Sequence, residues 1–322
     1  MHKIPIVFST DHNYIMQTGV CITSLLVNSN PNEYYDIFIL CSEDVSESDK
    51  QQLQNISQKY ERCCFNFIDL SNYFNDSFEV RSITKATYYR LMIPLLIPQY
   101  SKIIYSDTDI IFQRGLSDIY NEDITNYYLA AVFSGNAIVY NKTYNQYVRD
   151  LNLDPYTYVQ AGFLLINSAE MIKNDICSEF KLYSSRKFLF QDQDIINIVC
   201  KGKIKFLPLR YNYTQSSFFL LFSNKPLLLS RFSENEINDA SKGAIIHYEG
   251  TDKPWNSYCF RYDIWWEYYR KSLFFDAQFY FDSNNSLLNN NSNNNNNYTF
   301  QDLVKMISTH CKTTVKRIIR GH

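Results

Sequence analysis

The first 110 residues alternate between short apolar runs and amphipathic stretches, and this alternation constrains the fold more than any other feature of the sequence. Four apolar runs predict strands, at residues 4–8, 35–41, 65–70 and 102–105. The stretches between them predict helices, at residues 16–27, 46–60 and 84–96, the last interrupted by Pro94. Strands that alternate with helices indicate an α/β fold with a parallel, Rossmann-like sheet.

The second half of the chain is less regular. Three further strands are predicted, at residues 128–133, 163–166 and 244–248. Three helices are predicted as well, at residues 169–182, 193–200 and 265–273. We therefore expect one α/β domain over residues 1–283.

The composition changes abruptly near residue 283. Residues 284–298 are mostly Asn, which predicts a disordered linker. Residues 299–322 then carry apolar side chains at helical spacing together with several Lys and Arg, which predicts a basic amphipathic C-terminal helix. Such a helix on a polar tether is typical of attachment to an anionic membrane surface or a partner. The alternative is a helix that packs back on the domain.

Overall composition excludes some classes of function. The net charge is only −2, so no field strong enough for nucleic-acid binding is expected. No apolar run reaches the length of a membrane span, and the N-terminus lacks the apolar core of a signal peptide. The eight cysteines form no C-x-x-C pair, which favours buried thiols in a reducing compartment. We expect a cytoplasmic protein.

Two carboxylates, Asp107 and Asp109, lie one residue apart where the fourth predicted strand ends. Ligands of open α/β sheets bind at strand ends. Neighbouring carboxylates repel each other unless a cation neutralises them, and oxygen ligands suit Mg²⁺ or Mn²⁺. Such an ion would hold a diphosphate. The alternative is a solvated turn with two acids.

His247 ends a predicted strand and adds a nitrogen ligand that suits Mn²⁺. Gly250 would let the backbone approach a phosphate, and Lys253 would neutralise its charge. The alternative is a structural histidine. The sequence has neither a Gly-x-Gly-x-x-Gly loop nor a Walker loop, so a nucleotide is not expected to be held in either of those ways.

Three other segments have a structural alternative. Residues 192–194 begin a predicted helix, where an aspartate can simply cap it. Residues 160–162 precede a predicted strand, and their small side chains fit either a closely approaching ligand or a tight turn. Arg90 fits a charge on a helix surface.

Taken together and in order, these segments resemble glycosyltransferase family 8, whose members are retaining enzymes with the GT-A fold. The resemblance covers about residues 4–270. It rests on six motifs: Ser9-Thr10-Asp11-His12-Asn13-Tyr14, Ala86-Thr87-Tyr88-Tyr89-Arg90, Ile104-Tyr105-Ser106-Asp107-Thr108-Asp109, Gln160-Ala161-Gly162-Phe163-Leu164-Leu165-Ile166-Asn167, Gln191-Asp192-Gln193-Asp194 and His247-Tyr248-Glu249-Gly250-Thr251-Asp252-Lys253-Pro254-Trp255.

The resemblance implies a mixed central sheet flanked by helices, a UDP-sugar donor and a Mn²⁺ or Mg²⁺ ion. By the resemblance, the metal ligands are Asp107, Asp109 and His247. The implied donor-binding residues are Ser9, Thr10, Asp11, Asn13, Tyr14, Arg90, Thr108, Gln160, Ala161, Gly162, Asp192, Gln193, Gly250 and Lys253. Among them, Asp11 and Asn13 would contact uracil and ribose, and Tyr14 would stack on the base. The implied catalytic group consists of Arg90, Asp192, Gln193 and Asp194.

The resemblance also implies the reaction: transfer of galactose or glucose from UDP to a glycan acceptor of a lipopolysaccharide or another surface polysaccharide. The acceptor is an oligosaccharide, glycolipid or glycoprotein. Gln160 departs from the family pattern, which often has Asn there, so the donor sugar stays open. Two alternatives remain: a transferase that glycosylates protein, and a degenerate module that binds UDP-sugars without transfer. Gln193 is a poor nucleophile, which favours same-face attack over a covalent intermediate.

Overall fold

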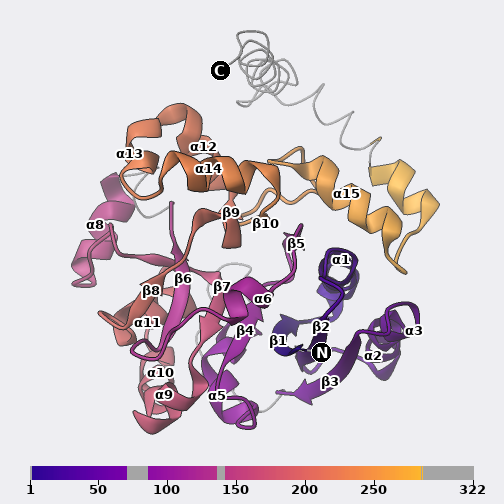
Figure 1. The fold of residues 1–322 in the computed structure, drawn as a ribbon, viewed down its shortest axis with the longest axis horizontal. Coiled ribbons are helices and arrows are strands. Elements are labelled where there is room, and N and C mark those ends of the chain that lie inside the picture. The colour runs from indigo at the N-terminus through magenta and orange to yellow at the C-terminus, as the bar shows by residue number, and fades with distance from the viewer. Residues whose placement is uncertain (1, 71–85, 136–141, 284, 286–322) are drawn as a thin grey trace.

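The computed structural model describes residues 2–70, 86–135, 142–283 and 285. A seven-stranded sheet forms its centre, and a three-stranded sheet lies beside it (Figure 1). The larger sheet has the order β3-β2-β1-β4-β7-β6-β8. Its strands are β1 (His2–Thr10), β2 (Glu33–Cys41), β3 (Cys63–Asp69), β4 (Ile103–Ser106), β6 (Leu129–Phe133), β7 (Val159–Ile166) and β8 (Ile204–Phe206).

The larger sheet is mixed. Strands β3, β2, β1 and β4 pair parallel with one another, as the strand–helix alternation predicts. Strand β7 then pairs antiparallel with both β4 and β6. Strands β2 and β7 are buried along almost their whole length, which explains why they appear in the sequence as continuous apolar runs.

The smaller sheet joins three distant segments: β5 (Ile110–Phe112), β9 (Tyr213–Thr214) and β10 (Ile245–His247). Strand β10 lies in the middle, antiparallel to β5 and parallel to β9. The chain passes from β4 of the larger sheet to β5 of the smaller one through Asp107, Thr108 and Asp109. The predicted metal-binding segment therefore lies at the junction of the two sheets.

The helices cover both sheets (Figure 1). Helix α1 (Ile15–Val27) packs against both β5 and α15 (Tyr262–Lys271). The first half of the chain contains η1 (His12–Tyr14), α1 (Ile15–Val27), α2 (Glu47–Gln54), α3 (Ile56–Lys59), α4 (Ala86–Tyr89), η2 (Arg90–Met92), α5 (Ile93–Leu96) and α6 (Ser117–Tyr120). The second half contains α8 (Lys142–Asp150), α9 (Ser168–Lys173), α10 (Ile176–Ser184), α11 (Gln191–Val199), η3 (Leu209–Tyr211), α12 (Gln215–Ser223), α13 (Lys225–Leu229), α14 (Glu234–Lys242) and α15 (Tyr262–Lys271).

Several predicted elements differ in detail from the observed ones. Within the described residues, the helix predicted at 84–96 is divided into α4, η2 and α5, and Pro94 lies in the first turn of α5, where its missing N–H has no helical partner to lose. The helix predicted at residues 46–60 is two helices, α2 and α3. The helix predicted at residues 169–182 is two helices, separated at Asp175, which has a positive φ of 53°. Residues 160–162 lie inside β7 rather than before it. The linker and the C-terminal helix fall outside the described residues and stay predictions.

Alternate side chains of β1 enter two separate cores, Ile4, Ile6 and Phe8 on one face of the sheet and Val7 on the other. The seven cysteines within the described residues are free, and all except Cys64 are buried, in agreement with the expected unpaired thiols. In the same part of the chain, every helix is too short or too polar to cross a bilayer.

Candidate active site

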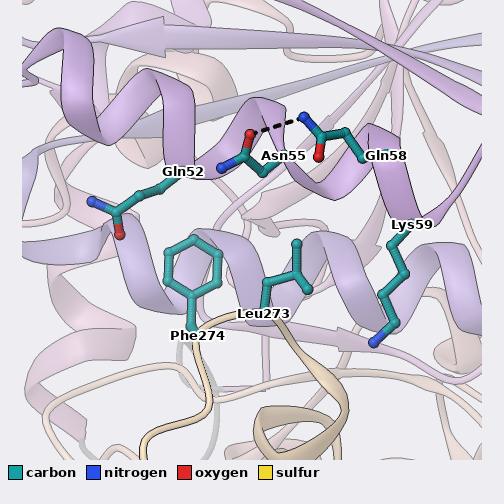
Figure 2. A pocket seen from close by; sticks show the side chains of 6 residues that line it. All are labelled: Gln52, Asn55, Gln58, Lys59, Leu273 and Phe274. Carbon is teal, nitrogen blue, oxygen red and sulfur yellow. Dashed lines mark hydrogen bonds between the residues drawn. The ribbon is translucent and has the colours of Figure 1, made fainter.

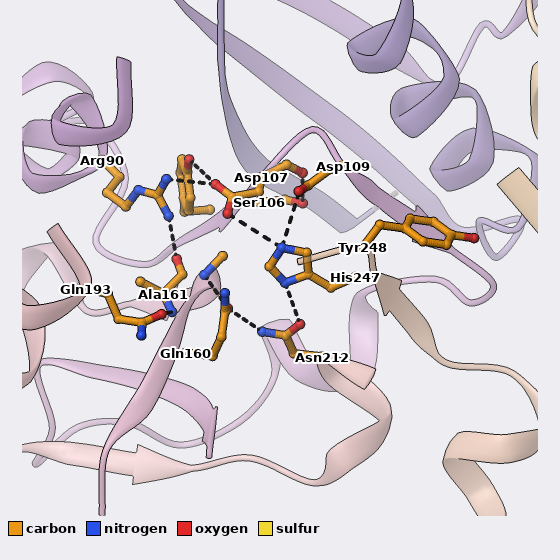
Figure 3. A network of polar contacts seen from close by, with 12 residues as sticks. Arg90, Ser106, Asp107, Asp109, Gln160, Ala161, Gln193, Asn212, His247 and Tyr248 are labelled. Atoms are coloured by element: carbon orange, nitrogen blue, oxygen red, sulfur yellow. Dashed lines mark hydrogen bonds and ion pairs between the residues drawn. The ribbon is translucent and has the colours of Figure 1, made fainter. Parts of the chain in front are cut away.

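The two acids and the histidine singled out in the sequence come together at the junction of the sheets (Figure 3). The Nε2 atom of His247 lies 3.2 Å from Oδ1 of Asp109 and 3.8 Å from Oδ2 of Asp107. One ligand atom from each residue lies within 4.8 Å of the other two. The backbone fixes this arrangement, since Tyr248 N donates to Asp109 O at 3.0 Å and Asp107 N to Gly162 O at 2.7 Å.

Gly162 is needed for this close approach. A Cβ atom at that position would lie 2.3 Å from Cε1 of His247 and 2.5 Å from Oδ2 of Asp107, both far inside van der Waals contact. The small residue therefore makes room for two side chains of the cluster. The alternative of a tight turn at Gly162 is wrong, because β7 continues through this residue.

Lys253 also enters the cluster. Its ammonium group donates to Oδ2 of Asp109 and, at 2.6 Å, to the carbonyl of Tyr248. Burial by itself would raise the pKa of Asp109, but Lys253 and His247 beside it hold that pKa well below its usual value. Burial disfavours the charged form of His247, yet Asp109 and Asp107 raise its pKa above the usual value. The cluster thus attracts positive charge strongly.

Arg90 is a buried part of the site and not a surface charge. Its guanidinium lies 2.8 Å from Oδ1 of Asp107 and 3.0 Å from Oδ2 of Asp192, and it donates to the carbonyl of Ala161 at 2.8 Å. It also stacks over the ring of Tyr105, 4.5 Å from the ring centre. Arg90 thereby connects the metal-ligand candidate Asp107 with helix α11.

The residues at the start of α11 have different surroundings. Burial raises the pKa of Asp192 to about 7, and Asp107 acts in the same direction, while Arg90 opposes both. Gln193 accepts a hydrogen bond from Ala161 N at 3.1 Å. Asp194 accepts from the hydroxyls of Tyr147 and Tyr158, each at 2.6 Å, and from Phe190 N at 2.8 Å. The Asp194 carboxylate therefore joins the start of α11 to Tyr147 and Tyr158, in addition to accepting from the backbone before the helix.

Asn212 is a residue of the site that sequence reasoning missed. Its side chain lies between His247 and Gln160, 3.0 Å from Nδ1 of the histidine and 2.8 Å from Oε1 of the glutamine (Figure 3). All three residues are buried. The segment Tyr211-Asn212-Tyr213 carries no sequence signal of a ligand site, so only the pairing of β9 with β10 reveals the contact.

The nucleotide-binding candidates follow β1. Oδ1 of Asp11 and Oγ of Ser9 are buried without a hydrogen-bond partner, so each is available to a ligand. Thr10 instead bonds to Thr18 inside the protein, at 2.9 Å. Burial raises the pKa of Asp11 above its usual value.

Near this group, the ring of Tyr14 meets the edge of Trp255, with ring centres 6.1 Å apart. Trp255 belongs to the last motif but had no predicted role. Asn13 is exposed and Thr108 is buried. Gly250 has a φ of +82°, a conformation that favours glycine, and open space surrounds the position of its missing Cβ.

A pocket of another kind lies between α2–α3 and the segment after α15 (Figure 2). Its lining mixes amides with Lys59, Leu273 and Phe274, and the Nζ atom of Lys59 donates to Lys271 O at 2.8 Å. None of the predicted donor or metal residues lines it. Of the predicted site residues, Arg90, Gly162 and Lys253 instead lie directly against the acid–histidine cluster.

The comparisons with known proteins agree on the family. The model of glycosyl transferase family 8 matches residues 5–259. A putative glycosyltransferase of Haemophilus influenzae is 31% identical over 259 residues, which are 79% of this chain and 73% of that protein. A lipopolysaccharide 1,2-glucosyltransferase of Escherichia coli is 25% identical over 77% of this chain and 72% of its own length.

The fold has a counterpart among solved structures. The galactosyltransferase LgtC, solved with donor and acceptor sugar analogs, superimposes with a TM-score of 0.69 at 21% identity, over 86% of this chain and 99% of that one. This likeness establishes a GT-A architecture, in agreement with the mixed sheet flanked by helices. With the family model matched over most of the chain and the fold shared, this protein belongs to glycosyl transferase family 8.

Proposed function

We propose that this glycosyltransferase moves galactose or glucose from a UDP-sugar to a glycan acceptor of a lipopolysaccharide or another surface polysaccharide, with retention at the anomeric carbon and dependence on Mn²⁺ or Mg²⁺. The observation that carries the proposal is the acid–histidine cluster, in which three potential ligand atoms lie within 4.8 Å of one another. Two carboxylates and an imidazole suit a divalent ion of this kind. When bound, it would stabilise negative charge on the departing UDP.

The hexose and the acceptor class are inferred from relatives. These relatives include the lipopolysaccharide 1,2-glucosyltransferase of Escherichia coli and a lipopolysaccharide 1,3-galactosyltransferase of Salmonella typhimurium. The latter is 22% identical over 80% of this chain. Half-buried Asp11, whose Oδ1 atom is buried without a partner, is suited to an N–H donor such as that of uracil.

The chain's own residues favour same-face attack over a covalent intermediate. A nucleophile needs an oxygen that the sugar can reach, but Asp194 is completely buried with three hydrogen bonds, and Asp192 is buried and paired with Arg90. Gln193 presents only an amide. We therefore propose that Asp192 and Gln193 bind and orient the donor sugar while Asp194 holds the start of α11 in place, and that the leaving phosphate accepts the proton of the acceptor hydroxyl.

We also propose a cytoplasmic location with peripheral attachment to the membrane. Several apolar side chains are exposed just before the Asn-rich segment, with Phe275 44% and Phe281 62% exposed. The basic residues further along the chain would add attraction to anionic lipid.

The test is release of UDP from a panel of UDP-sugars, with Mn²⁺ and with EDTA, in the presence and absence of lipid-linked oligosaccharide. We expect metal-dependent release from UDP-galactose or UDP-glucose, increased by the acceptor. Binding of UDP without release from any sugar would instead support a degenerate binding module. Sugar incorporated into a protein acceptor, with none into glycan, would support protein glycosylation.

A further inference from the structure

We propose that Asn212 and Gln160 fix the position of the hydrogen on the imidazole of His247, so that Nε2 keeps a free lone pair for a divalent ion. Both act through His247 and are therefore positioning residues. The inference rests on the proposed metal role of His247 and adds two residues that hold it in the binding form. Such partners of a ligating histidine influence metal affinity strongly.

The direction of the hydrogen bonds follows from one backbone group. The N–H of Gly162 can only donate, and it lies 2.5 Å from the end of the Gln160 side chain, which must therefore be the oxygen. The same oxygen also lies 2.8 Å from Asn212, so the amide nitrogen of Asn212 faces it. The oxygen of Asn212 then faces Nδ1 of His247 at 3.0 Å.

This direction determines the tautomer of the neutral imidazole. Since the Asn212 oxygen can only accept, Nδ1 of His247 must carry the hydrogen and donate it. The other ring nitrogen, Nε2, points at the oxygens of Asp109 and Asp107. In the neutral ring this nitrogen has no hydrogen, so its lone pair is directed at the place where the two carboxylates converge.

Burial makes the arrangement specific. Asn212 is completely buried, and His247 and Gln160 are 2% and 9% exposed, so water competes little for these bonds. Reversing either amide would place two donors or two acceptors against each other, at a cost typical of buried unpaired polar groups. The chain from Gly162 to His247 therefore has one favourable direction.

The direct test needs no substitution. Full-length, metal-free protein with ¹⁵N-labelled histidine is studied by long-range ¹H–¹⁵N correlation, at a pH above the titration of His247, and the signal is assigned by its absence in His247→Gln. We expect the pattern of an Nδ1–H imidazole. An Nε2–H pattern would overturn the inference. If wild-type protein with the Nε2–H pattern still binds Mn²⁺ and releases UDP from a sugar donor, the proposed function stands. Only the positioning role of Asn212 and Gln160 is then refuted.

A second test compares matched variants by Mn²⁺ titration with electron paramagnetic resonance. Asn212→Leu removes the acceptor, so we expect a loss of Mn²⁺ affinity of about 10- to 100-fold and a mixture of tautomers. Asn212→Asp keeps an acceptor for Nδ1–H and should preserve the tautomer, although its second oxygen faces Oε1 of Gln160 in place of an N–H donor and should lower the stability of the protein. Gln160 is the next residue of the hydrogen-bond chain, and the pair Gln160→Leu and Gln160→Glu tests it in the same way. The Leu variant should again lose more Mn²⁺ affinity than the acidic one, with smaller losses than at Asn212.

The variants separate positioning from simple stability. A purely structural role would lower the melting temperature of Asn212→Leu and leave the Nδ1–H pattern unchanged, which would contradict the inference. Equal Mn²⁺ affinity in Asn212→Leu and the wild type would contradict it as well. If Asn212→Leu does not fold, the wild-type tautomer and the comparison of Gln160→Leu with Gln160→Glu, whose oxygen can still accept from Gly162 and Asn212, still decide. Wild-type protein without any Mn²⁺ binding would contradict the proposed function itself.

Discussion

At the scale of single residues, the site depends on a few charged side chains that neutralise one another. Asp109 is the central one, because both Lys253 and His247 lie against its carboxylate. A lysine so placed neutralises an acid that would otherwise be buried with excess negative charge. It also competes with any cation that approaches Asp109.

Lys253→Met should therefore have opposite effects on two ligands. Affinity for Mn²⁺ alone should rise a few-fold, because the competing ammonium group is gone. Affinity for UDP in the presence of Mn²⁺ should fall by about tenfold, as expected when a charged hydrogen bond to phosphate is lost. Calorimetry with UDP and a Mn²⁺ titration measure the two effects, with the exposed Lys242→Met as control. A fall in both affinities would contradict the competition.

At the scale of elements, the junction between the sheets is held by a carboxylate far from the chemistry. Glu33 at the start of β2 is 1% exposed. It accepts from Asn30 N at 2.8 Å, from the hydroxyl of Tyr35 at 2.7 Å, and from N and Oγ of Ser117 at 2.8 and 2.6 Å. This group ties the start of α6, which follows β5, to β2. Although burial opposes ionisation, the bonds from Ser117 and Tyr35 lower the pKa of Glu33 below its usual value.

Glu33→Gln should lower the free energy of unfolding at pH 7 by about 1–3 kcal/mol, because an amide cannot accept all of these bonds. Since the folded-state pKa of Glu33 is depressed, its contribution is present above the unfolded-state value and is lost as the pH falls through the folded-state value. The difference between wild type and variant should therefore stay constant from pH 7 to about 5 and narrow as the pH falls below the ordinary value of 4.5, to about 3. Urea unfolding across this range measures it, with the exposed Glu61→Gln as control. A difference that is constant across the whole range would contradict the assignment.

Local patterns predicted the strands and helices of the first half well, because each apolar run or helical face appears in consecutive residues. They could not predict that β7 lies antiparallel beside β4, since strand pairing is a non-local choice. For the same reason Asn212 went unnoticed, although Asp107, Asp109 and His247 were found. The sequence shows that residue 162 is a glycine. It does not show why a glycine is needed there, because His247 and Asp107 come close to it only in the folded structure.

At the scale of the whole molecule, the described domain and the remaining C-terminal residues have separate tasks in the proposed function. The acid–histidine cluster belongs entirely to the domain. The basic residues Lys305, Lys312, Lys316, Arg317 and Arg320 follow it in the sequence. Membrane attachment and donor chemistry should therefore be separable by substitution.

Deleting residues 284–322, or changing these five basic residues to Gln in the full chain, should leave UDP-sugar hydrolysis unchanged. Binding to vesicles rich in phosphatidylglycerol should fall by at least roughly tenfold, since each basic residue contributes about 1 kcal/mol near an anionic surface. Vesicles of phosphatidylcholine alone are the control, and co-sedimentation is the measurement. Unchanged binding of both variants to the anionic vesicles would refute the membrane role.

The measurement that tests the central claim most directly is calorimetric titration of the full-length protein with UDP, in Mn²⁺ and in EDTA, for the wild type and Asp109→Asn. The claim is that Asp107, Asp109 and His247 hold a divalent ion that binds the diphosphate. We expect tight binding only for the wild type in Mn²⁺, and a loss of more than about tenfold in Asp109→Asn, since losing even a hydrogen-bond partner of a metal ligand costs about 10- to 100-fold. Binding of equal strength in EDTA, or an unaffected Asp109→Asn protein, would contradict it.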